Sequence, residues 1–415
     1  MRSSARSPAL GLTGPSGLGL QCRAQSAMGS KANEEIKKAL DNNDLGLAAS
    51  IAKKHLKDIN NIQLNIAVTG ETGCGKSTFV NAFRGIDDED ERAAPTGNVE
   101  TTVKPESFPH PRHPNVIIWD LPGVGTTKFP ADQYLKHVGF EKFDFFIIVS
   151  ADRFKENDVM LAQEIKKMGK KFYYIRSKID NNLRAAKRKT KYNKGETLQK
   201  IRENCIQGLE DEGVTSPQVF LVSLFDLHKY DFPTLQETIE RDMPSLKRDV
   251  LILALPNVCR GNIHKKKEVF SSRIEYYAVL SGGAAAVPLL GFSFVVDALM
   301  LVYVVTTYVY GFGLDEKSLE KLSSDTKTPL PDLMKVMKCP LSGKDVTKAL
   351  VDPMLSSCSA QFSLSTAETV FSWIPFFGAA VNVPHSYSIT YKFLSDTLDS
   401  LSVDAENVLK AAVGI

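Results

Sequence analysis

The chain has 415 residues, which is enough for two or three domains. Hydrophobic residues make up 43% and charged residues 24%, an ordinary globular mixture with enough apolar material for a core. The formal net charge of +3 gives no support for a nucleic-acid-binding protein. The six cysteines are scattered and never fall in a CxxC or other metal-binding spacing, which is typical of reduced thiols in an intracellular protein.

Residues 1–31 are predicted to be a disordered N-terminal extension. They are rich in Ser, Gly, Ala and Arg, and Gly and Pro interrupt the apolar residues too often for a secretory signal. A transit peptide has a similar composition, but disorder is favoured. A start at Met28 would expose Gly29, yet Asn33 stands where a myristoylation signal needs Ser or Thr. The sequence therefore does not support a lipid anchor.

Residues 32–60 follow a helical pattern, because their apolar side chains recur at spacings of three and four. The polar break "DNND" at residues 41–44 divides this pattern and predicts two helices in a hairpin. The apolar stripe of the second helix consists of Leu45, Ala48, Ile51, Ala52, His55 and Leu56.

Residues 61–246 alternate short apolar runs with amphipathic stretches, which predicts an α/β domain whose mostly parallel sheet is covered by helices on both faces. The rest of the chain, residues 247–415, reads as helices and predicts a second, all-α domain. The apolar runs of the first domain are "IQLNIAV", "NVIIWD", "FDFFIIVS", "KFYYIRS" and "QVFLVS".

The stretch "GETGCGKS" at residues 70–77 fits the phosphate-binding pattern G-x-x-x-x-G-K-[ST]. Glycines let successive backbone N–H groups point at phosphate oxygens. We expect Lys76 to reach the β and γ phosphates and Ser77 to bind Mg²⁺. An ordinary Gly-rich turn with a surface lysine is the alternative. The pattern is favoured because it follows an apolar run and opens a helical stretch, whose N-terminus also attracts phosphate.

Two further motifs follow predicted strands. In "WDLPG", Asp120 is placed to hold Mg²⁺ through water, and the Gly123 N–H is placed to meet the γ-phosphate. In "SKID" at residues 177–180, Asp180 can accept both hydrogens of the guanine N1 and N2 edge, a donor pair that adenine does not present. "SKID" by itself would read as a polar loop. Its position after the other two motifs favours guanine.

The residues that would control hydrolysis lie around these motifs. Thr101 and Thr102 stand where a switch threonine would bind Mg²⁺ only when the γ-phosphate is present. Val124 stands where Ras-like enzymes place a glutamine that orients the attacking water, so hydrolysis should be slow or depend on another group. Glu100 is a candidate for that group. A solvated loop carboxylate is an equally good interpretation of Glu100.

The predicted site residues fall into three sets. The catalytic set is Lys76, Glu100, Thr102 and Gly123. The Mg²⁺ ligands are Ser77, Thr102 and Asp120. The nucleotide contacts are Gly70, Glu71, Thr72, Gly73, Cys74, Gly75, Lys76, Ser77, Thr78, Ser177, Lys178, Asp180 and Ser223. GTP or GDP and Mg²⁺ are therefore the expected ligands.

These motifs resemble the immunity-related GTPases, the interferon-inducible GTPase family. The segments that carry the resemblance are "GETGCGKSTFVNAFRG", "AAPTGNVETT", "PNVIIWDLPGVGTTKF", "FDFFIIVSADRFKENDV", "KKFYYIRSKID", "KYDFPTL" and "FGLDEKSL". The likeness is dense over the first domain and looser after about residue 260. By this likeness Lys76 belongs to the GKS type, whereas Ser177 departs from the usual Thr or Asn.

The resemblance implies a Ras-like P-loop G domain set on a helical domain that both ends of the chain build, so residues 32–60 would pack on residues 247–415. It also implies slow GTP hydrolysis stimulated by self-assembly, and a role in cell-autonomous immunity. Partners would be further copies of the chain and, peripherally, an intracellular membrane surface, with no nucleic acid. Two alternatives stay open: a GTP-binding scaffold with negligible hydrolysis, which Val124 permits, and a P-loop ATPase, which "SKID" disfavours.

Two other segments each have a structural interpretation and a functional one. The basic run at residues 184–194 reads first as a solvated charge run, with contact to anionic lipid or a partner subunit as the alternative. Residues 276–314 are long and apolar enough to cross a bilayer. The glycines, Pro288 and the central Asp297 instead favour a buried or conditionally exposed apolar hairpin within the helical domain. The protein would then be cytoplasmic and would contact intracellular membranes only peripherally.

Overall fold

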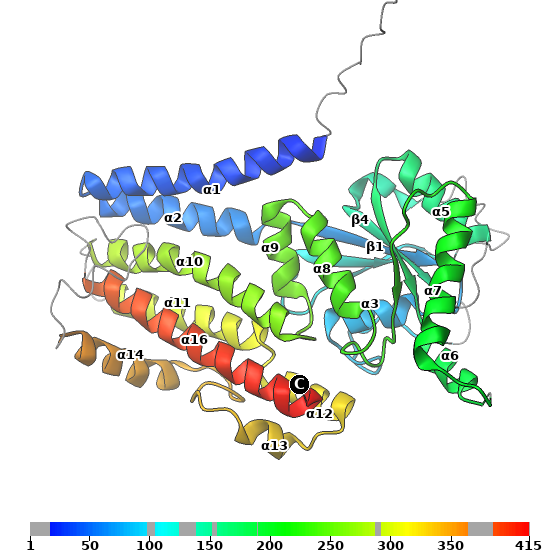
Figure 1. Ribbon diagram of the computed structural model, residues 1–415. Coiled ribbons are helices and arrows are strands. Elements are labelled where there is room, and N and C mark those ends of the chain that lie inside the picture. The colour runs from blue at the N-terminus through cyan, green and yellow to red at the C-terminus, as the bar shows by residue number, and fades with distance from the viewer. Residues whose placement is uncertain are drawn as a thin grey trace, which may run out of the picture.

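The computed structural model describes residues 17–97, 104–123, 138–151, 156–188, 190–286, 292–363 and 385–414. An α/β part built on a twisted sheet lies beside a bundle of long helices, and both ends of the chain contribute to the bundle (Figure 1). The predicted fold class is therefore confirmed: a mostly parallel α/β domain together with helices from the N- and C-terminal segments that contact each other.

The sheet has six strands in the order β2-β3-β1-β4-β5-β6. All neighbours are parallel except β2 and β3, which pair in antiparallel fashion at one edge. The apolar runs form these strands because burial on both faces favours continuous hydrophobic sequence, and every residue of β4 is buried. The strands are β1 (Leu64–Gly70), β2 (Glu106–Pro109), β3 (Val116–Asp120), β4 (Phe145–Ser150), β5 (Lys171–Arg176) and β6 (Val219–Leu221).

Helices cover both faces of the sheet. The alternating side chains of β1 show the division, because Ile66 belongs to one apolar cluster and its neighbour Ala67 to another. The first cluster is completed by α3 (Lys76–Arg84), α8 (Phe232–Asp242) and part of α9 (Ser245–Ala254). The second is completed by α5 (Glu156–Lys167), α6 (Ile179–Ala186) and α7 (Lys194–Asp211), with the short η1 (Phe140–Lys142) beside it.

The boundary predicted between residues 246 and 247 falls inside α9. Val250 and Leu251 of this helix pack in the core of the sheet, whereas Ile252 and Leu253 pack in the core of the bundle. One helix therefore belongs to both parts. The remaining bundle helices are α10 (Arg260–Ala286), α11 (Phe292–Gly311), α12 (Glu316–Thr326), α13 (Leu330–Lys335), α14 (Lys348–Ser363) and α16 (His385–Val413).

The N-terminal hairpin consists of α1 (Gly17–Asp41) and α2 (Leu45–Asn60), and Asp44 caps α2 by accepting from the Leu47 N–H. Its apolar residues form one cluster with side chains of α10 and α16. The approach of α2 to α10 is close, since a Cβ at Gly283 would lie 2.3 Å from the Cβ of Ala49. The cluster consists of Ile36, Ala39, Ala48, Ala52, Leu56, Tyr276, Ala278, Val279 and Tyr387.

Helix α1 begins earlier than the sequence predicted. It starts at Gly17, so residues 17–31 are helical where a disordered extension was expected. The reason is local propensity: between the glycines stand Leu, Gln, Arg, Ala and Met, which are good helix formers, and each glycine costs only about 1 kcal/mol. The prediction of disorder rested on the Ser-, Gly-, Ala- and Arg-rich composition, which does not prevent a helix from continuing out of a packed neighbour.

The apolar segment at residues 276–314 is divided between α10 and α11. One helical stretch, Ala298–Thr326, is long and apolar enough to cross a membrane, and 56% of its apolar window is buried within the protein. Inward-facing residues such as Leu301, Val305 and Tyr308 belong to the bundle core. A core helix passes the same length test, so bilayer crossing stays an open part of the prediction. The side chain of Asp297 lies outside the described residues.

Lys266 of α10 is buried where the bundle meets the α/β part. Its Nζ donates to the Gly311 carbonyl oxygen at 2.8 Å, an oxygen that also accepts from Asn257 Nδ2 at 3.1 Å. Burial, and secondarily the positive charge of Arg112, lowers the pKa of Lys266 from its ordinary 10.5 to about 7. This lysine therefore loses its charge in the folded protein well below the pH at which the unfolded chain does.

We predict that the free energy of unfolding rises with pH between 7 and 9. In that range the unfolded chain keeps the Lys266 proton and the folded chain releases it, so each pH unit adds up to about 1.4 kcal/mol. Lys266→Met should flatten this rise, because methionine has no proton to release. The variant should still fold, since Asn257 continues to donate to the Gly311 carbonyl oxygen. Lys267→Met, at an adjacent and more exposed lysine, is the control. Urea unfolding at several pH values measures the effect; an equal slope in Lys266→Met and wild type would contradict it.

Candidate nucleotide-binding site

The phosphate-binding loop runs from the end of β1 to the start of α3, as the sequence context required. Three of its glycines have positive φ: Gly70 (140°), Gly73 (77°) and Gly75 (101°). A Cβ at Gly70 would lie only 2.1 Å from the Val149 carbonyl oxygen of β4, so that position accepts only glycine. Gly75 caps α3 in the left-handed conformation and turns the loop into the helix. The loop therefore folds into the curled path that exposes backbone N–H groups to a phosphate.

Lys76 is folded back over this loop. Its side chain is 8% exposed, and its Nζ donates to the Glu71 carbonyl oxygen at 3.1 Å. The ammonium is thus held at the loop by a backbone oxygen rather than by a carboxylate. A lysine in this position can donate to phosphate oxygens with only a local change of its hydrogen bond.

Ser77, the residue after Lys76, contacts Asp120. The Ser77 Oγ donates to Asp120 Oδ2 at 2.6 Å, and Asp120 is buried at the end of β3, in register with Val68 of β1. Hydroxyl and carboxylate oxygens are the donors that Mg²⁺ prefers, so the two residues fit the predicted ion. The third predicted ligand, Thr102, lies outside the described residues. Among those that are described, no group of three or more His, Cys, Asp or Glu side chains could hold a metal by itself.

Gly123 lies directly against the phosphate-binding loop. A Cβ at Gly123 would come within 2.2 Å of Thr72 Oγ1 and 3.1 Å of the Thr72 backbone nitrogen, so only glycine allows this approach. Of the predicted catalytic set, the structure thus brings Gly123 and Lys76 to the same loop. Glu100 and Thr102, together with Thr101 and Val124, lie outside the described residues, and their proposed roles stay predictions.

The "SKID" loop is tied to the phosphate-binding loop by side chains. The buried Ser177 Oγ donates to the Cys74 carbonyl oxygen at 2.6 Å and lies 3.2 Å from the Ser150 carbonyl oxygen. Lys178 adopts a left-handed conformation, with φ of 55°, and its Nζ donates to the Gly73 carbonyl oxygen at 2.7 Å. Ser177 therefore supplies the side-chain hydroxyl that connects the two loops.

Asp180 stands in the first turn of α6, just beyond that join. The helix start is fixed by the buried Ile179, whose N–H donates to the Val222 carbonyl oxygen at 3.3 Å. Asp180 faces Tyr230: burial, and next the Asp180 carboxylate, raises the pKa of the Tyr230 hydroxyl. Tyr230 was not predicted as a site residue. Its one sequence signal was its place in "KYDFPTL", among the segments that carried the family resemblance.

The loop after β6 also lies against the phosphate-binding loop. Ser223, a predicted nucleotide contact, is buried there, and its carbonyl oxygen accepts from the Asp226 N–H at 3.4 Å. The next residue, Leu224, packs against the phosphate-binding loop, since its Cδ1 would lie 3.3 Å from a Cβ at Gly75. Leu224 was missed because nothing in an apolar residue after a strand marks it as a site neighbour.

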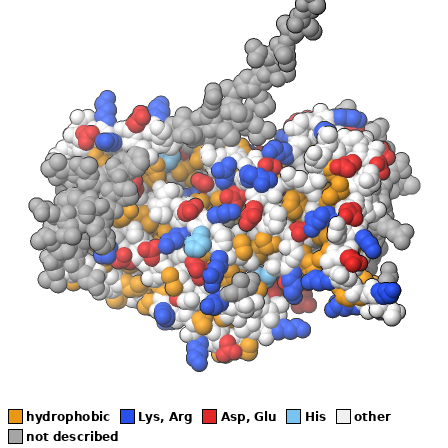
Figure 2. Space-filling view, viewed as in Figure 1, with side chains coloured by type: hydrophobic (Ala, Val, Ile, Leu, Met, Phe, Trp, Pro, Cys, Tyr) orange, Lys and Arg blue, Asp and Glu red, His pale blue; other side chains and the backbone are white. Residues whose placement is uncertain are grey.

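The basic run at residues 184–194 starts within α6. Its described lysines and arginines are exposed, and Figure 2 shows blue side chains at the end of the molecule where α6 lies. The Nζ of Lys194 lies 5.4 Å from the ring centroid of Tyr230, which links this run to the loop facing Asp180. The rest of the run makes a solvated charged surface beside the site.

We predict that Ser177→Ala weakens GDP binding roughly tenfold. The change leaves the buried Cys74 carbonyl without this donor, which costs about 1–3 kcal/mol and loosens the join between the two loops. Ser356→Ala is the control, because that hydroxyl makes a similar bond to the Asp352 carbonyl on α14, away from the site. Fluorescent GDP titration measures both. An affinity equal to wild type in Ser177→Ala would mean that the join does not shape the site.

Comparison with known proteins agrees with this geometry. The sequence matches the family model described as "Interferon-inducible GTPase (IIGP)" over residues 30–412. It is 36% identical to interferon-gamma-inducible GTPase 10 of Mus musculus, over 92% of this chain and 89% of that protein. It is 43% identical to T-cell-specific guanine nucleotide triphosphate-binding protein 2 of Mus musculus, over 72% of this chain and 73% of that protein.

Among solved structures, Toc33 from Arabidopsis thaliana in complex with Mg²⁺ and GMPPNP covers 42% of this chain and 77% of its own. Its identity is 14% and its TM-score is 0.31, a likeness that supports no conclusion. The family assignment rests on the sequence matches, which extend across both the α/β part and the helical bundle. This chain belongs to the interferon-inducible GTPase (IIGP) family.

Proposed function

We propose that this GTP-binding, immunity-related protein is a slow Mg²⁺-dependent GTPase that switches with its nucleotide and assembles with further copies of itself. The observation that carries the proposal is the pair of side-chain bonds from Ser177 and Lys178 to the phosphate-binding loop. They join the "SKID" loop to the phosphate-binding loop, which supports the proposal that both loops belong to one nucleotide site. The proposed setting is the cytoplasm, with peripheral attachment to intracellular membranes.

The chemistry asks little covalent work of the protein, because phosphoryl transfer depends mainly on positioning and charge stabilisation. Lys76 and the backbone N–H groups of the glycine loop would bind the β and γ phosphates. Ser77 and Asp120 would hold Mg²⁺, which neutralises charge on those phosphates when it is bound. Gly123, beside Thr72, would offer its N–H to the γ-phosphate.

A single copy of the chain lacks the glutamine that orients the attacking water in Ras-like GTP hydrolysis. Val124 replaces the glutamine that orients water in Ras-like enzymes, and a valine side chain neither donates nor accepts a hydrogen bond. We therefore propose that turnover is slow in the isolated chain and rises on assembly, with Glu100 as the proposed group that positions the water. A GTP-binding scaffold with negligible hydrolysis is the second candidate, and the same valine favours it.

GTP turnover measured against protein concentration tests the proposal. We expect the rate per protein molecule to rise with concentration, because contact between copies completes the site. Lys76→Ala, which removes the cation aimed at the phosphates, should stay at background throughout. A rate that stays at background in the wild type at every concentration would support the scaffold instead. A constant, measurable rate per molecule would contradict stimulation by assembly.

Guanine recognition makes a separate prediction. Asp180→Asn should weaken GTP binding by one to two decades, because a charge-assisted pair contributes about 1.5–3 kcal/mol. The same variant should gain affinity for xanthosine triphosphate, whose O2 can accept from the new amide. Asp211→Asn, at the C-terminal end of α7 outside the site, is the control. Competition titrations decide; unchanged GTP affinity in Asp180→Asn would remove Asp180 from the base site and reopen the ATPase alternative.

A further inference from the structure

The antiparallel hairpin of β2 and β3 connects the nucleotide site to the helical bundle. At one end of the ladder Glu106 pairs with Asp120, and at the other Pro109 pairs with Ile117. The intervening residues 110–115, called here the hairpin tip, are closed by backbone bonds from His110 N to Val116 O and from Val116 N to His113 O, both at 2.8 Å. The predicted Mg²⁺ ligand Asp120 therefore lies at one end of this short hairpin, and residues 110–115 lie at the other end.

The hairpin tip is inserted into the bundle. His110 is only 7% exposed, and His113 is partly buried and hydrogen-bonds to the backbone of Leu253 in α9. Burial lowers the pKa of both histidines, that of His113 to about 3, with the charge of Lys266 contributing to each. Both rings are therefore neutral near pH 7. They pack as uncharged groups beneath the contacts that the hairpin tip makes with the bundle.

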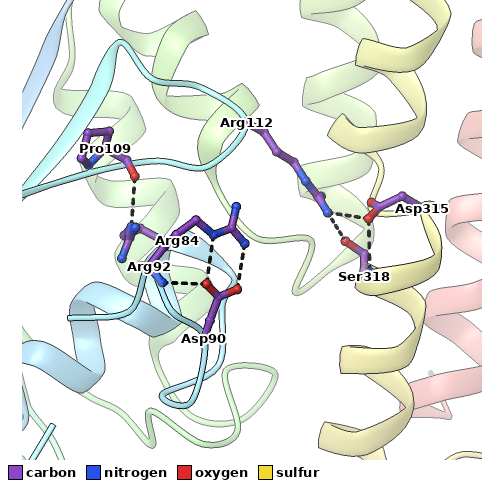
Figure 3. A network of polar contacts seen from close by, with 7 residues as sticks. All are labelled: Arg84, Asp90, Arg92, Pro109, Arg112, Asp315 and Ser318. Atoms are coloured by element: carbon purple, nitrogen blue, oxygen red, sulfur yellow. Dashed lines mark hydrogen bonds and ion pairs between the residues drawn. The ribbon is translucent and has the colours of Figure 1, made fainter. Parts of the chain in front are cut away.

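Arg112, near the centre of the hairpin tip, binds the bundle with both terminal nitrogens of its guanidinium group. One terminal nitrogen donates to Asp315 Oδ2 at 2.7 Å and to Ser318 Oγ at 2.6 Å, and the other donates to the Tyr310 carbonyl oxygen at 3.0 Å. The guanidinium also lies 5.1 Å from the ring centroid of Tyr310. Figure 3 shows the arginine reaching from the hairpin to Asp315 and Ser318.

The partners of Arg112 are themselves fixed. Asp315 is the N-cap of α12 and accepts from the Ser318 N–H, so Arg112 binds a carboxylate that the helix start already orients. The side chains of Arg112 and Asp315 are only 29% and 13% exposed. Partial burial and three acceptors distinguish this contact from an ordinary surface ion pair, which contributes about 0–1 kcal/mol.

The base of the hairpin has its own tie to the phosphate-binding loop. Asp120 accepts from Ser77 there. Midway, Arg84 of α3 donates to the Pro109 carbonyl oxygen at 3.2 Å, and its guanidinium lies 5.4 Å from the ring centroid of Phe108 (Figure 3). Among the described residues β2 pairs only with β3, whereas β3 also pairs with β1 from Val116 to Asp120. Beyond this strand pairing, Arg84 holds the hairpin along its length and Arg112 holds its tip.

We propose that Arg112 is a positioning residue for the nucleotide site: by fixing the hairpin tip to the start of α12, it holds Asp120 in place at the other end of the same hairpin. The helical bundle would thereby help to position a Mg²⁺ ligand that its described residues do not contact. The inference rests on the proposed Mg²⁺ role of Asp120 only for its functional consequence, and the mechanical part stands on the contacts themselves.

The first test measures the hairpin directly, by amide hydrogen exchange in nucleotide-free protein. Arg112→Ala should make the peptide covering residues 104–121 exchange roughly tenfold faster, while β4 and β5 exchange as in wild type. Lys321→Ala is the matched control. This lysine of α12 pairs with Asp87 in the α/β part, so its loss breaks another contact between the two parts and leaves the hairpin tip alone. Unchanged exchange in the hairpin, or equally faster exchange throughout the sheet, would overturn the proposal.

The second test asks whether the effect reaches the ion. Arg112→Ala should raise the Mg²⁺ concentration that half-saturates GTP binding about tenfold, as expected for a residue that orients a ligand. GDP binding in the presence of a chelator should stay unchanged, because Asp120 acts through the ion. Asp315→Ala should have the same effect, and the double variant should be no worse than the more affected single variant.

The two arms separate this inference from the proposed function. If wild-type GTP binding did not respond to Mg²⁺, the proposed role of the ion would fail, and the exchange experiment would still decide whether Arg112 holds the hairpin. If Arg112→Ala and Asp315→Ala had purely additive effects, or lost GDP binding in chelator as well, Arg112 would be an ordinary structural residue and the inference would be wrong.

Discussion

The path of the phosphate-binding loop is the constraint on which the rest of the site depends. Gly70 must pass the β4 carbonyl at Val149 at a distance that excludes any Cβ, and Gly123 must pass Thr72 in the same way. Parallel strands end at one edge of the sheet, so the loops after β1, β3, β5 and β6 converge at this point. Each of the other three loops then contacts the first, through Gly123, Ser177 or Leu224.

These contacts explain how a site with several loops can be shaped before its ligand arrives. The bonds from Ser177 and Lys178 end on carbonyl oxygens of the phosphate-binding loop, so they fix its backbone while leaving its N–H groups for phosphate oxygens. Preformed loops lower the ordering cost of binding.

The helical bundle is joined to this frame at the sheet edge and through α9. Arg112 binds the start of α12, and Lys321 of that helix reaches Asp87 beyond α3. Lys266 and His110 are buried at this junction. Two of the described segments that α12 contacts, the β2–β3 hairpin and the residues after α3, continue from elements of the candidate nucleotide site.

The parts of the fold that sequence predicted are those encoded by local pattern. Continuous apolar runs gave the parallel strands, the break at residues 41–44 gave the hairpin of α1 and α2, and glycine spacing gave the loop before α3. The contacts that assemble these parts have no local signal. The bond from Arg112 to Asp315 joins residues 203 apart in sequence, and an arginine in a turn reads as solvent-exposed.

Composition misled at one point and gave no signal at others. Residues 17–31 were predicted to be disordered from their Ser-, Gly-, Ala- and Arg-rich composition, although a helix extends into them from packed residues downstream. Leu224 and Tyr230 border the site through packing and charge that only the folded loop creates. Glu100 and Thr102 stay predictions, because they lie outside the residues that the structure describes.

The claim that these loops form one guanine-nucleotide site is tested most directly by calorimetric titration of the nucleotide-free protein. GDP and ADP would be titrated in turn, with Mg²⁺ at a fixed concentration. A site whose carboxylate at Asp180 must pair with the N1 and N2 hydrogens of guanine should prefer GDP by at least about a hundredfold, because adenine leaves that group unpaired. Binding of ADP within tenfold of GDP would contradict the assignment of the base site.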